Sequence, residues 1–147
     1  MSAIRPLILV AGILLIATGS TRADDIRWRP TYRDAYEESL KTGKPMFMEF
    51  TADTCYWCKK LESTTLSTPD VAKLINERFI PVKIDATAEV ELVRAVGVQA
   101  LPTLFVLAPD RTILNRYEGY AEAPQILQFL QHGLERCPAP GEKQDDK

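Results

Sequence analysis

The sequence predicts an α/β domain in which a central mixed β-sheet is flanked by α-helices. Short apolar runs of strand length alternate with amphipathic stretches of helical period from residue 24 to residue 136. The chain has 147 residues, of which 46% are hydrophobic and 26% are charged, and this fits one ordinary globular domain. No internal repeat is visible. We therefore expect a single domain over residues 24–136.

The first elements are a helix and a buried strand. Residues 31–42 carry apolar side chains at helical spacing and are followed by Gly43 and Pro45, which end helices. Residues 46–50 form a nearly continuous apolar run, as expected for a central strand covered on both faces. The one charge in this run, Glu49, is therefore anomalous.

Two helices, a strand and a short helix are expected next. One helix should begin at Cys55, and another at Pro69, because proline is favoured at the first helical position and Thr68 is a good N-cap. Residues 79–84 have the composition of a strand. Residues 87–96 predict a short helix that ends before a glycine.

The last third of the domain predicts a hairpin and a final helix. Residues 103–107 are β-branched, aromatic and aliphatic, which favours a strand. Residues 109–110 supply a turn, and residues 112–117 form the return strand up to Gly119. Residues 123–134 then carry the apolar stripe of an amphipathic helix.

Both ends of the chain differ from the domain. Residues 1–23 are typical of a secretory signal peptide, with Arg5 as the positive end and residues 7–17 as an apolar core too short for a bilayer, which needs about 20 residues. We expect cleavage after Ala23 and a periplasmic or otherwise exported domain; an uncleaved anchor would leave it on the same side of the membrane. Residues 137–147 are too polar to bury and are predicted to be a disordered tail.

The charge balance narrows the classes of partner. Eighteen Lys and Arg residues stand against 20 Asp and Glu residues, and the net charge is −2. No basic block could neutralise a phosphate backbone, so nucleic acid is not an expected partner.

The chemistry is carried by Cys55-Tyr56-Trp57-Cys58, a Cys-x-x-Cys motif between a buried strand and a helix. A cysteine at a helix N-terminus faces unpaired backbone N–H groups, which favour the thiolate, so Cys55 is the expected nucleophile. Cys58 lies one turn further along, within disulfide distance, and is the expected resolving thiol. This spacing predicts redox chemistry.

Other readings of these cysteines were weighed. A purely structural disulfide would stabilise little, because the helix already holds the two residues together. A zinc site could use Cys55, Cys58, Cys137 and His132, but no second paired motif organises them. A c-type haem requires histidine after the second cysteine, where Lys59 stands. We expect no metal and no cofactor.

From Trp28 to Leu134 the chain resembles the thioredoxin family. The strand that ends in residues 49–53 before the Cys-x-x-Cys motif, the segment 98–105 around a proline, and Gly119 before the last helix all match the family pattern. The resemblance implies a thioredoxin fold and thiol-disulfide exchange. The potential and the partners stay open, because Tyr-Trp replaces the Gly-Pro dipeptide of thioredoxin itself.

Within that family, the chain looks most like exported thioredoxin-like proteins, which include the soluble end domain of DsbD. This similarity lies in residues 25–28, in Lys44-Pro45, and in residues 59–62 after the second cysteine. It implies protein disulfides as substrates, a membrane-embedded redox partner, and electron flow toward disulfide reduction. We expect a monomer.

The resemblance also implies roles for residues around the cysteines. A cis bond between Leu101 and Pro102 would place Pro102 against the cysteines and leave the Leu101 backbone free to bind an extended substrate; a trans proline at a strand start is the alternative. Tyr56 and Trp57 would form the apolar surface that recognises substrate, or simply cover the helix.

Glu49 lies six residues before Cys55, where thioredoxin carries a buried acid that exchanges protons with the resolving thiol. Burial would raise its pKa, which suits a proton acceptor. If Glu49 instead faces away from the cysteines, it is a satisfied or solvated strand residue, and Lys83 on a neighbouring strand could pair with it.

The sequence therefore predicts an exported thiol-disulfide oxidoreductase that acts through Cys55 and Cys58, with Glu49 moving the proton and Pro102 shaping the substrate groove. The alternative is a thioredoxin-fold module that holds a client protein or a Cu(I) ion without turnover, since paired thiolates suit Cu(I).

Overall fold

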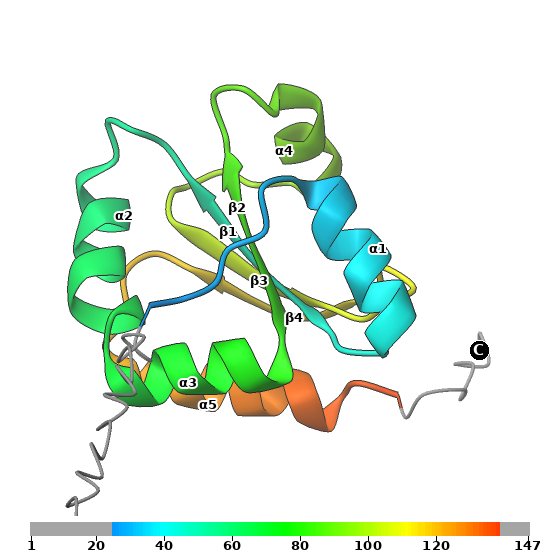
Figure 1. Ribbon diagram of the computed structural model, residues 1–147. Helices are drawn as coiled ribbons and strands as arrows, with labels where there is room; N and C mark the ends of the chain where they lie inside the picture. Colours follow the sequence, from blue (N-terminus) through cyan, green and yellow to red (C-terminus); the bar gives the residue numbers. More distant parts are fainter. Residues whose placement is uncertain (1–24, 139–147) are drawn as a thin grey trace, which may run out of the picture.

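A computed structural model describes residues 25–138, so the predicted signal peptide (residues 1–23) and residues 139–147 of the predicted tail lie outside the described residues. Its centre is a four-stranded sheet in the order β2-β1-β3-β4 (Figure 1). Strands β1 and β2 are parallel, whereas β3 is antiparallel to both β1 and β4. The predicted α/β class with a mixed sheet is confirmed. In chain order the elements are α1 (Tyr32–Thr42), β1 (Met46–Thr51), α2 (Tyr56–Leu61), the π-helix η1 (Glu62–Leu66), α3 (Pro69–Arg78), β2 (Ile80–Asp85), α4 (Val90–Val96), β3 (Thr103–Leu107), β4 (Ile113–Glu118) and α5 (Ala123–Glu135).

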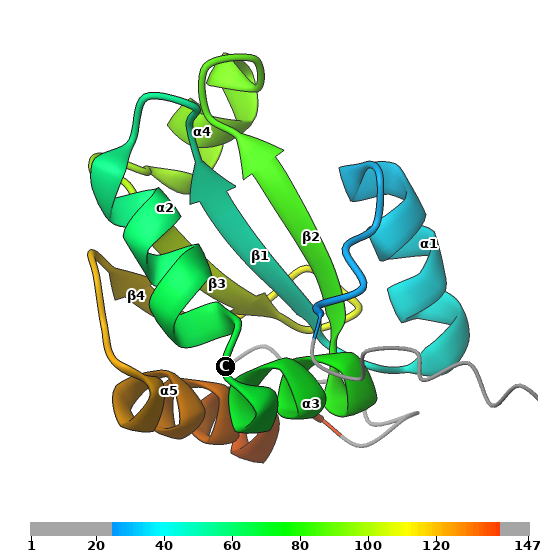
Figure 2. The same ribbon diagram turned by 60° about the vertical axis from the view of Figure 1, so that its left-hand side comes forward.

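Helices cover both faces of the sheet, as Figures 1 and 2 show from two sides. On one face, α1 and α4 pack over an apolar cluster that includes Met48, Phe50 and Phe105. On the other face, α2, α3 and α5 enclose a larger cluster around Phe47 and Leu104. The active-site candidates belong to this second face, because α2 carries the Cys-x-x-Cys motif.

Strand β1 lies at the centre of the sheet and alternates between these two faces. Met48 and Phe50 belong to the cluster under α1, and Phe47 belongs to the cluster under α2, α3 and α5. Successive side chains of a strand point to opposite faces, so Glu49 lies on the same face as Phe47. The anomalous charge is thus buried beneath the helix that bears the cysteines.

The boundaries of α1 follow from its ends. The hydroxyl of Thr31 accepts the backbone N–H of Asp34 at 3.1 Å, so Thr31 is the N-cap and not the first helical residue. Gly43 ends the helix with φ of 71°, a left-handed conformation that glycine adopts without strain, and its N–H donates to the Ser39 carbonyl at 2.8 Å.

Thr68 precedes α3 as expected but does not act as a side-chain cap. Its hydroxyl donates to the Thr65 carbonyl at 2.7 Å, at the end of the π-helix η1. The π-helix continues directly from α2 and was not expected from the sequence. It releases a carbonyl near the start of α3, and the Thr68 side chain binds this acceptor in place of the helix N–H groups.

Helix α4 begins at Val90, three residues later than the prediction of residue 87. The Asp85 carboxylate accepts the backbone N–H of Thr87 at 2.8 Å and the Thr87 hydroxyl at 2.7 Å. Such local side-chain bonds stabilise a turn in competition with helix. The strand therefore leads into a turn before the helix can start.

The ends of the domain pack against the core. Trp28 contacts Phe47 with a centroid separation of 5.9 Å, and Arg29 forms a parallel bridge with Val82 beside β2. The predicted tail begins at Cys137, yet this residue is half-buried against the apolar core and its N–H donates to the Leu134 carbonyl at 3.1 Å. None of the helices between residues 25 and 138 has the length and apolar character needed to span a bilayer.

Candidate active site

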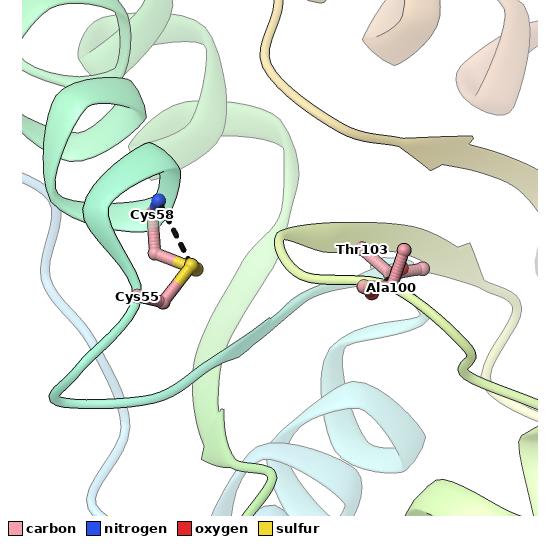
Figure 3. The surroundings of a disulfide bond; sticks show 4 residues. All are labelled: Cys55, Cys58, Ala100 and Thr103. Atoms are coloured by element: carbon pink, nitrogen blue, oxygen red, sulfur yellow. Dashed lines mark hydrogen bonds between the residues drawn. A yellow bond between two sulfur atoms is a disulfide. The ribbon is translucent and has the colours of Figure 1, made fainter.

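Cys55 and Cys58 form a disulfide at the start of α2, with their Cα atoms 5.3 Å apart (Figure 3). Cys55 is the N-cap residue of α2, in an extended conformation, and its Sγ accepts the backbone N–H of Cys58 at 3.2 Å. Cys58 is fully buried, whereas Cys55 is only partly buried. An incoming nucleophile or disulfide can thus reach Cys55 and not Cys58.

The backbone N–H that points at the Cys55 sulfur has a chemical consequence after reduction. Hydrogen bonds from N–H groups at a helix N-terminus favour a thiolate over a thiol. The thiolate is the attacking form in disulfide exchange. The geometry therefore assigns the nucleophile to Cys55 and leaves Cys58 as the thiol that could resolve a mixed disulfide.

The loop before β3 lies in the surroundings of the disulfide, as Figure 3 shows for Ala100 and Thr103. The peptide bond between Leu101 and Pro102 is cis. The loop is held at both ends: the Thr103 hydroxyl donates to the Ala100 carbonyl at 2.7 Å, and the Pro102 carbonyl accepts the N–H of Gly119 at 2.8 Å. Within residues 25–138, no hydrogen bond engages the backbone of Leu101.

Two large aromatic side chains beside the cysteines are exposed to solvent. Tyr56 is 68% exposed and Trp57 is 49% exposed, so neither serves mainly as cover for the helix. The Trp57 ring lies 5.7 Å from that of Tyr120, and the Lys60 ammonium lies 5.0 Å and 4.9 Å from the two ring centroids. Sequence reasoning missed Tyr120 and Lys60; the position of Tyr120 directly after Gly119 was the available signal.

Glu49 is the most unusual side chain of the site. It is completely buried, and neither carboxylate oxygen has a hydrogen-bond partner among the described residues. Burial, with a smaller contribution from Glu62, raises the pKa of Glu49 to about 8, although Lys83 acts in the opposite direction. Glu49 is thus neither solvated nor satisfied, which is the alternative that the sequence left open. Its role in proton transfer stays a prediction.

Lys83 does not pair with Glu49, although the two Cα atoms are partners in the register of β1 and β2. Its Nζ is 2.6 Å from a carboxylate oxygen of Glu62 and 4.9 Å from the centroid of the Trp28 ring. Sequence reasoning missed Glu62, although it lies four residues after Cys58 and hence on the same side of the helix.

The residues weighed as a zinc site are not brought together. His132 is exposed on α5, Cys137 is half-buried at the end of that helix, and Cys55 is bonded to Cys58. Over residues 25–138, no three His, Cys, Asp or Glu side chains gather where they could hold a metal ion. Burial, and then Asp110, raise the pKa of the Cys137 thiol, which makes it a weak nucleophile.

A mixed sheet with a Cys-x-x-Cys disulfide at the N-terminus of α2, beside a loop with a cis proline, defines a protein of thioredoxin fold. The sequence model of the thioredoxin-like domain matches residues 32–134, and the chain belongs to this family. The predicted resemblance is thereby confirmed.

Two curated relatives show how far the sequence similarity extends. The chain is 32% identical over 97 residues to the thiol:disulfide interchange protein DsbD of Cronobacter sakazakii, which covers 63% of this chain and 17% of that protein. It is 30% identical over 60 residues to human spermatogenesis-associated protein 20, which covers 41% of this chain and 8% of that protein. The chain thus spans a small part of these relatives.

Two solved structures have the same fold. A thioredoxin from Thermus thermophilus is 25% identical, with a TM-score of 0.71, 80% of this chain covered and 93% of that chain. A structure named DsbH oxidoreductase has a TM-score of 0.69 at 21% identity, with 85% and 95% covered.

Proposed function

We propose that this protein is an exported thiol-disulfide oxidoreductase that reduces disulfides in other proteins through Cys55 and Cys58. The observation that carries the proposal is the Cys55–Cys58 disulfide itself, in which the partly exposed sulfur accepts a backbone N–H and the second sulfur is buried. A structural disulfide needs neither this asymmetry nor an unpaired buried acid below it.

The reaction begins with the reduced pair. The Cys55 thiolate attacks one sulfur of a substrate disulfide, so that a Cys55–substrate bond forms, the substrate S–S bond breaks, and one substrate thiolate leaves. Cys58 then gives its proton to the Glu49 carboxylate and attacks Cys55 Sγ. The Cys55–Cys58 disulfide forms, the second substrate thiol is released, and two electrons have passed to the substrate.

The cycle requires a reductant that restores both thiols. We assign this role to a membrane-embedded dithiol protein, which accords with the similarity to a thiol:disulfide interchange protein. Export accords with the signal-peptide pattern of residues 1–23.

The surface around Cys55 suits an extended polypeptide. The unengaged backbone of Leu101 offers an N–H and a carbonyl to a substrate strand, as in the addition of a strand to a sheet edge. Tyr56 and Trp57 offer exposed ring area to its side chains. A protein substrate can therefore be held in register while its disulfide meets Cys55.

Trapping tests the proposal. The Cys58→Ser variant, carrying also Cys137→Ser, should accumulate mixed disulfides between Cys55 and an oxidised protein substrate, whereas the matched Cys55→Ser variant should accumulate none. A module that only holds a client or Cu(I) would give no mixed disulfide and, for copper, stoichiometric metal. Equilibration against thiol-disulfide buffers gives the direction: a potential below about −230 mV supports a reductase, and one above about −180 mV opposes it.

A further inference from the structure

The buried carboxylate of Glu49 has no partner, yet a lysine stands opposite it. The groups that face Glu49 come from four elements: Lys83 from β2, Glu62 from η1, Cys58 from α2, and the apolar Leu104 from β3. Lys83 is the one cation among them. In parallel strands, partners in register point to the same face, so the lysine stem starts beside Glu49.

Lys83 is held away from Glu49 by two contacts on its other side. Its ammonium binds Glu62 at 2.6 Å and lies 4.9 Å from the Trp28 ring centroid. About one third of each of the paired side chains is exposed, 33% for Lys83 and 32% for Glu62. An ion pair this accessible is worth little, on the order of 1 kcal/mol or less, so its rupture is cheap.

A pocket gives the ammonium room and water. It has a volume of about 260 Å³ and reaches solvent at the exposed residues Asp25 and Ser67. Both Lys83 and Glu62 line it, together with Trp28. A cavity of this size holds several water molecules, so Glu62 stays hydrated when the lysine leaves it.

We propose that Lys83 is a positioning residue with two carboxylate partners: its ammonium binds Glu62 while Glu49 is protonated and turns to Glu49 when that carboxyl loses its proton. The inference rests on the proposed function, in which Glu49 exchanges a proton with Cys58. No covalent bond changes. The Glu49 proton passes to water, the Lys83 charge is retained, and Glu62 exchanges the ammonium for water of the pocket.

The arrangement solves a problem of burial. A buried carboxylate without a partner is strongly disfavoured, and a base that is protonated at neutral pH cannot accept a proton from Cys58. An ammonium that arrives with ionisation stabilises the carboxylate form only when it is needed. Glu62 is the alternative partner that sets how easily Lys83 is released.

The experiment is a double-mutant cycle read as the titration of the Glu49 carboxyl. In the reduced protein without residues 1–23, carrying Cys137→Ser, the 13C signal of Glu49 is assigned by its loss in Glu49→Gln. Its midpoint is then measured in the parent, Lys83→Gln, Glu62→Gln and the double variant. Lys83→Gln should raise the midpoint and Glu62→Gln should lower it. The effect of Lys83→Gln should be larger by about one pH unit when Glu62 is absent, because Lys83 is then free to bind Glu49.

Additive effects, or a midpoint that ignores Lys83→Gln, would overturn the inference, since the lysine would then act from a fixed distance. Lys73→Gln, which removes an exposed lysine of α3, is the charge control and should leave the midpoint unchanged. Lys83→Met preserves the aliphatic stem over Trp28 and serves if the glutamine variant fails to fold.

The titration needs no turnover, so it separates this inference from the proposed function. Non-additive midpoints without mixed disulfides in Cys58→Ser would sustain the two-partner lysine and reject the oxidoreductase. Mixed disulfides with additive midpoints would reject the two-partner lysine alone. Where both hold, the pH at which Cys58 resolves a mixed disulfide should move with the Glu49 midpoint in each variant.

Discussion

The Cα atoms of Glu49 and Lys83 are partners in the parallel register of β1 and β2, yet no hydrogen bond or ion pair joins their side chains. The carboxyl is buried and the ammonium is turned to the pocket. This separation leaves the burial of Glu49 uncompensated, and its cost should be visible in the pH dependence of folding.

The first prediction concerns the free energy of unfolding of the oxidised protein. The pKa of Glu49 is raised from 4.5 to about 8, so the folded state binds this proton more tightly than the unfolded state. The resulting stability is fully present below about pH 4.5 and is lost as pH rises toward about 8. In that window the free energy of unfolding should fall by up to about 1.4 kcal/mol per pH unit from this group alone.

Guanidinium unfolding at pH 5, 6, 7 and 8 checks this slope. Glu49→Gln should flatten it and make the protein more stable than the parent at pH 8. Glu37→Gln, an exposed acid on α1, is the matched control and should follow the parent. Equal slopes in the parent and Glu49→Gln would show that Glu49 is ionised in the folded protein.

The second prediction concerns which thiol reacts. In the reduced protein an alkylating reagent should modify Cys55 more than about tenfold faster than Cys58, because Cys58 is completely buried. Cys137 should also react slowly, since it is half-buried and the pKa of its thiol is raised. Mass spectrometry of digested samples over a time course measures all three rates. Comparable rates at Cys55 and Cys58 would contradict the assignment of the nucleophile.

Much of this site could be predicted because its signals are local. The Cys-x-x-Cys motif, a helix start at Cys55 and a charge in an apolar strand at Glu49 are all read within about ten residues of sequence. Their relative placement followed from the thioredoxin resemblance, which a match to residues 32–134 confirms.

The missed features depend on tertiary contacts. The choice of Lys83 between Glu49 and Glu62 is set by how η1 lies over the sheet, and a π-helix has no simple sequence period. Tyr120 reaches Trp57 only because the chain after β4 returns past α2. No spacing rule on one element could have paired these residues.

The third prediction concerns the ring pair beside the disulfide. Tyr120→Leu removes the aromatic contact with Trp57 and one of the two rings that face the Lys60 ammonium. Such contacts are worth about 0.5 to 1 kcal/mol, so kcat/KM toward a protein disulfide should fall roughly two- to fivefold. A small disulfide such as oxidised glutathione should be reduced at the parent rate, because it does not extend over the rings.

Tyr120→Phe is the control for this prediction. It retains the ring and loses only the hydroxyl, which lies 3.3 Å from the hydroxyl of Thr64. It should keep the parent activity toward both substrates. A similar loss toward protein and small disulfides in Tyr120→Leu would mean that the change reaches the cysteines themselves.

The fourth prediction concerns the packing of α5 on the sheet. A Cβ at Gly133 would lie 2.8 Å from Cγ1 of Val106 and 2.9 Å from its Cβ and Cγ2. Val106 is completely buried in β3, so its side chain has no space into which to move. Overpacking of this kind costs about 1 to 3 kcal/mol, and the better helix propensity of alanine offsets up to about 1 kcal/mol. Gly133→Ala should therefore lower the free energy of unfolding by about 1 to 2 kcal/mol.

A double-mutant cycle separates the clash from other effects of the substitution. Val106→Ala removes the methyl groups that a Cβ at Gly133 would meet, so in that background Gly133→Ala should be neutral or stabilising in denaturant unfolding. The same loss in both backgrounds would mean that the helix tolerates no side chain at this position for another reason. Cys58→Ser trapping should be unaffected in Gly133→Ala at temperatures where the variant is folded, because α5 packs on β3 and β4 and contributes no side chain to the disulfide.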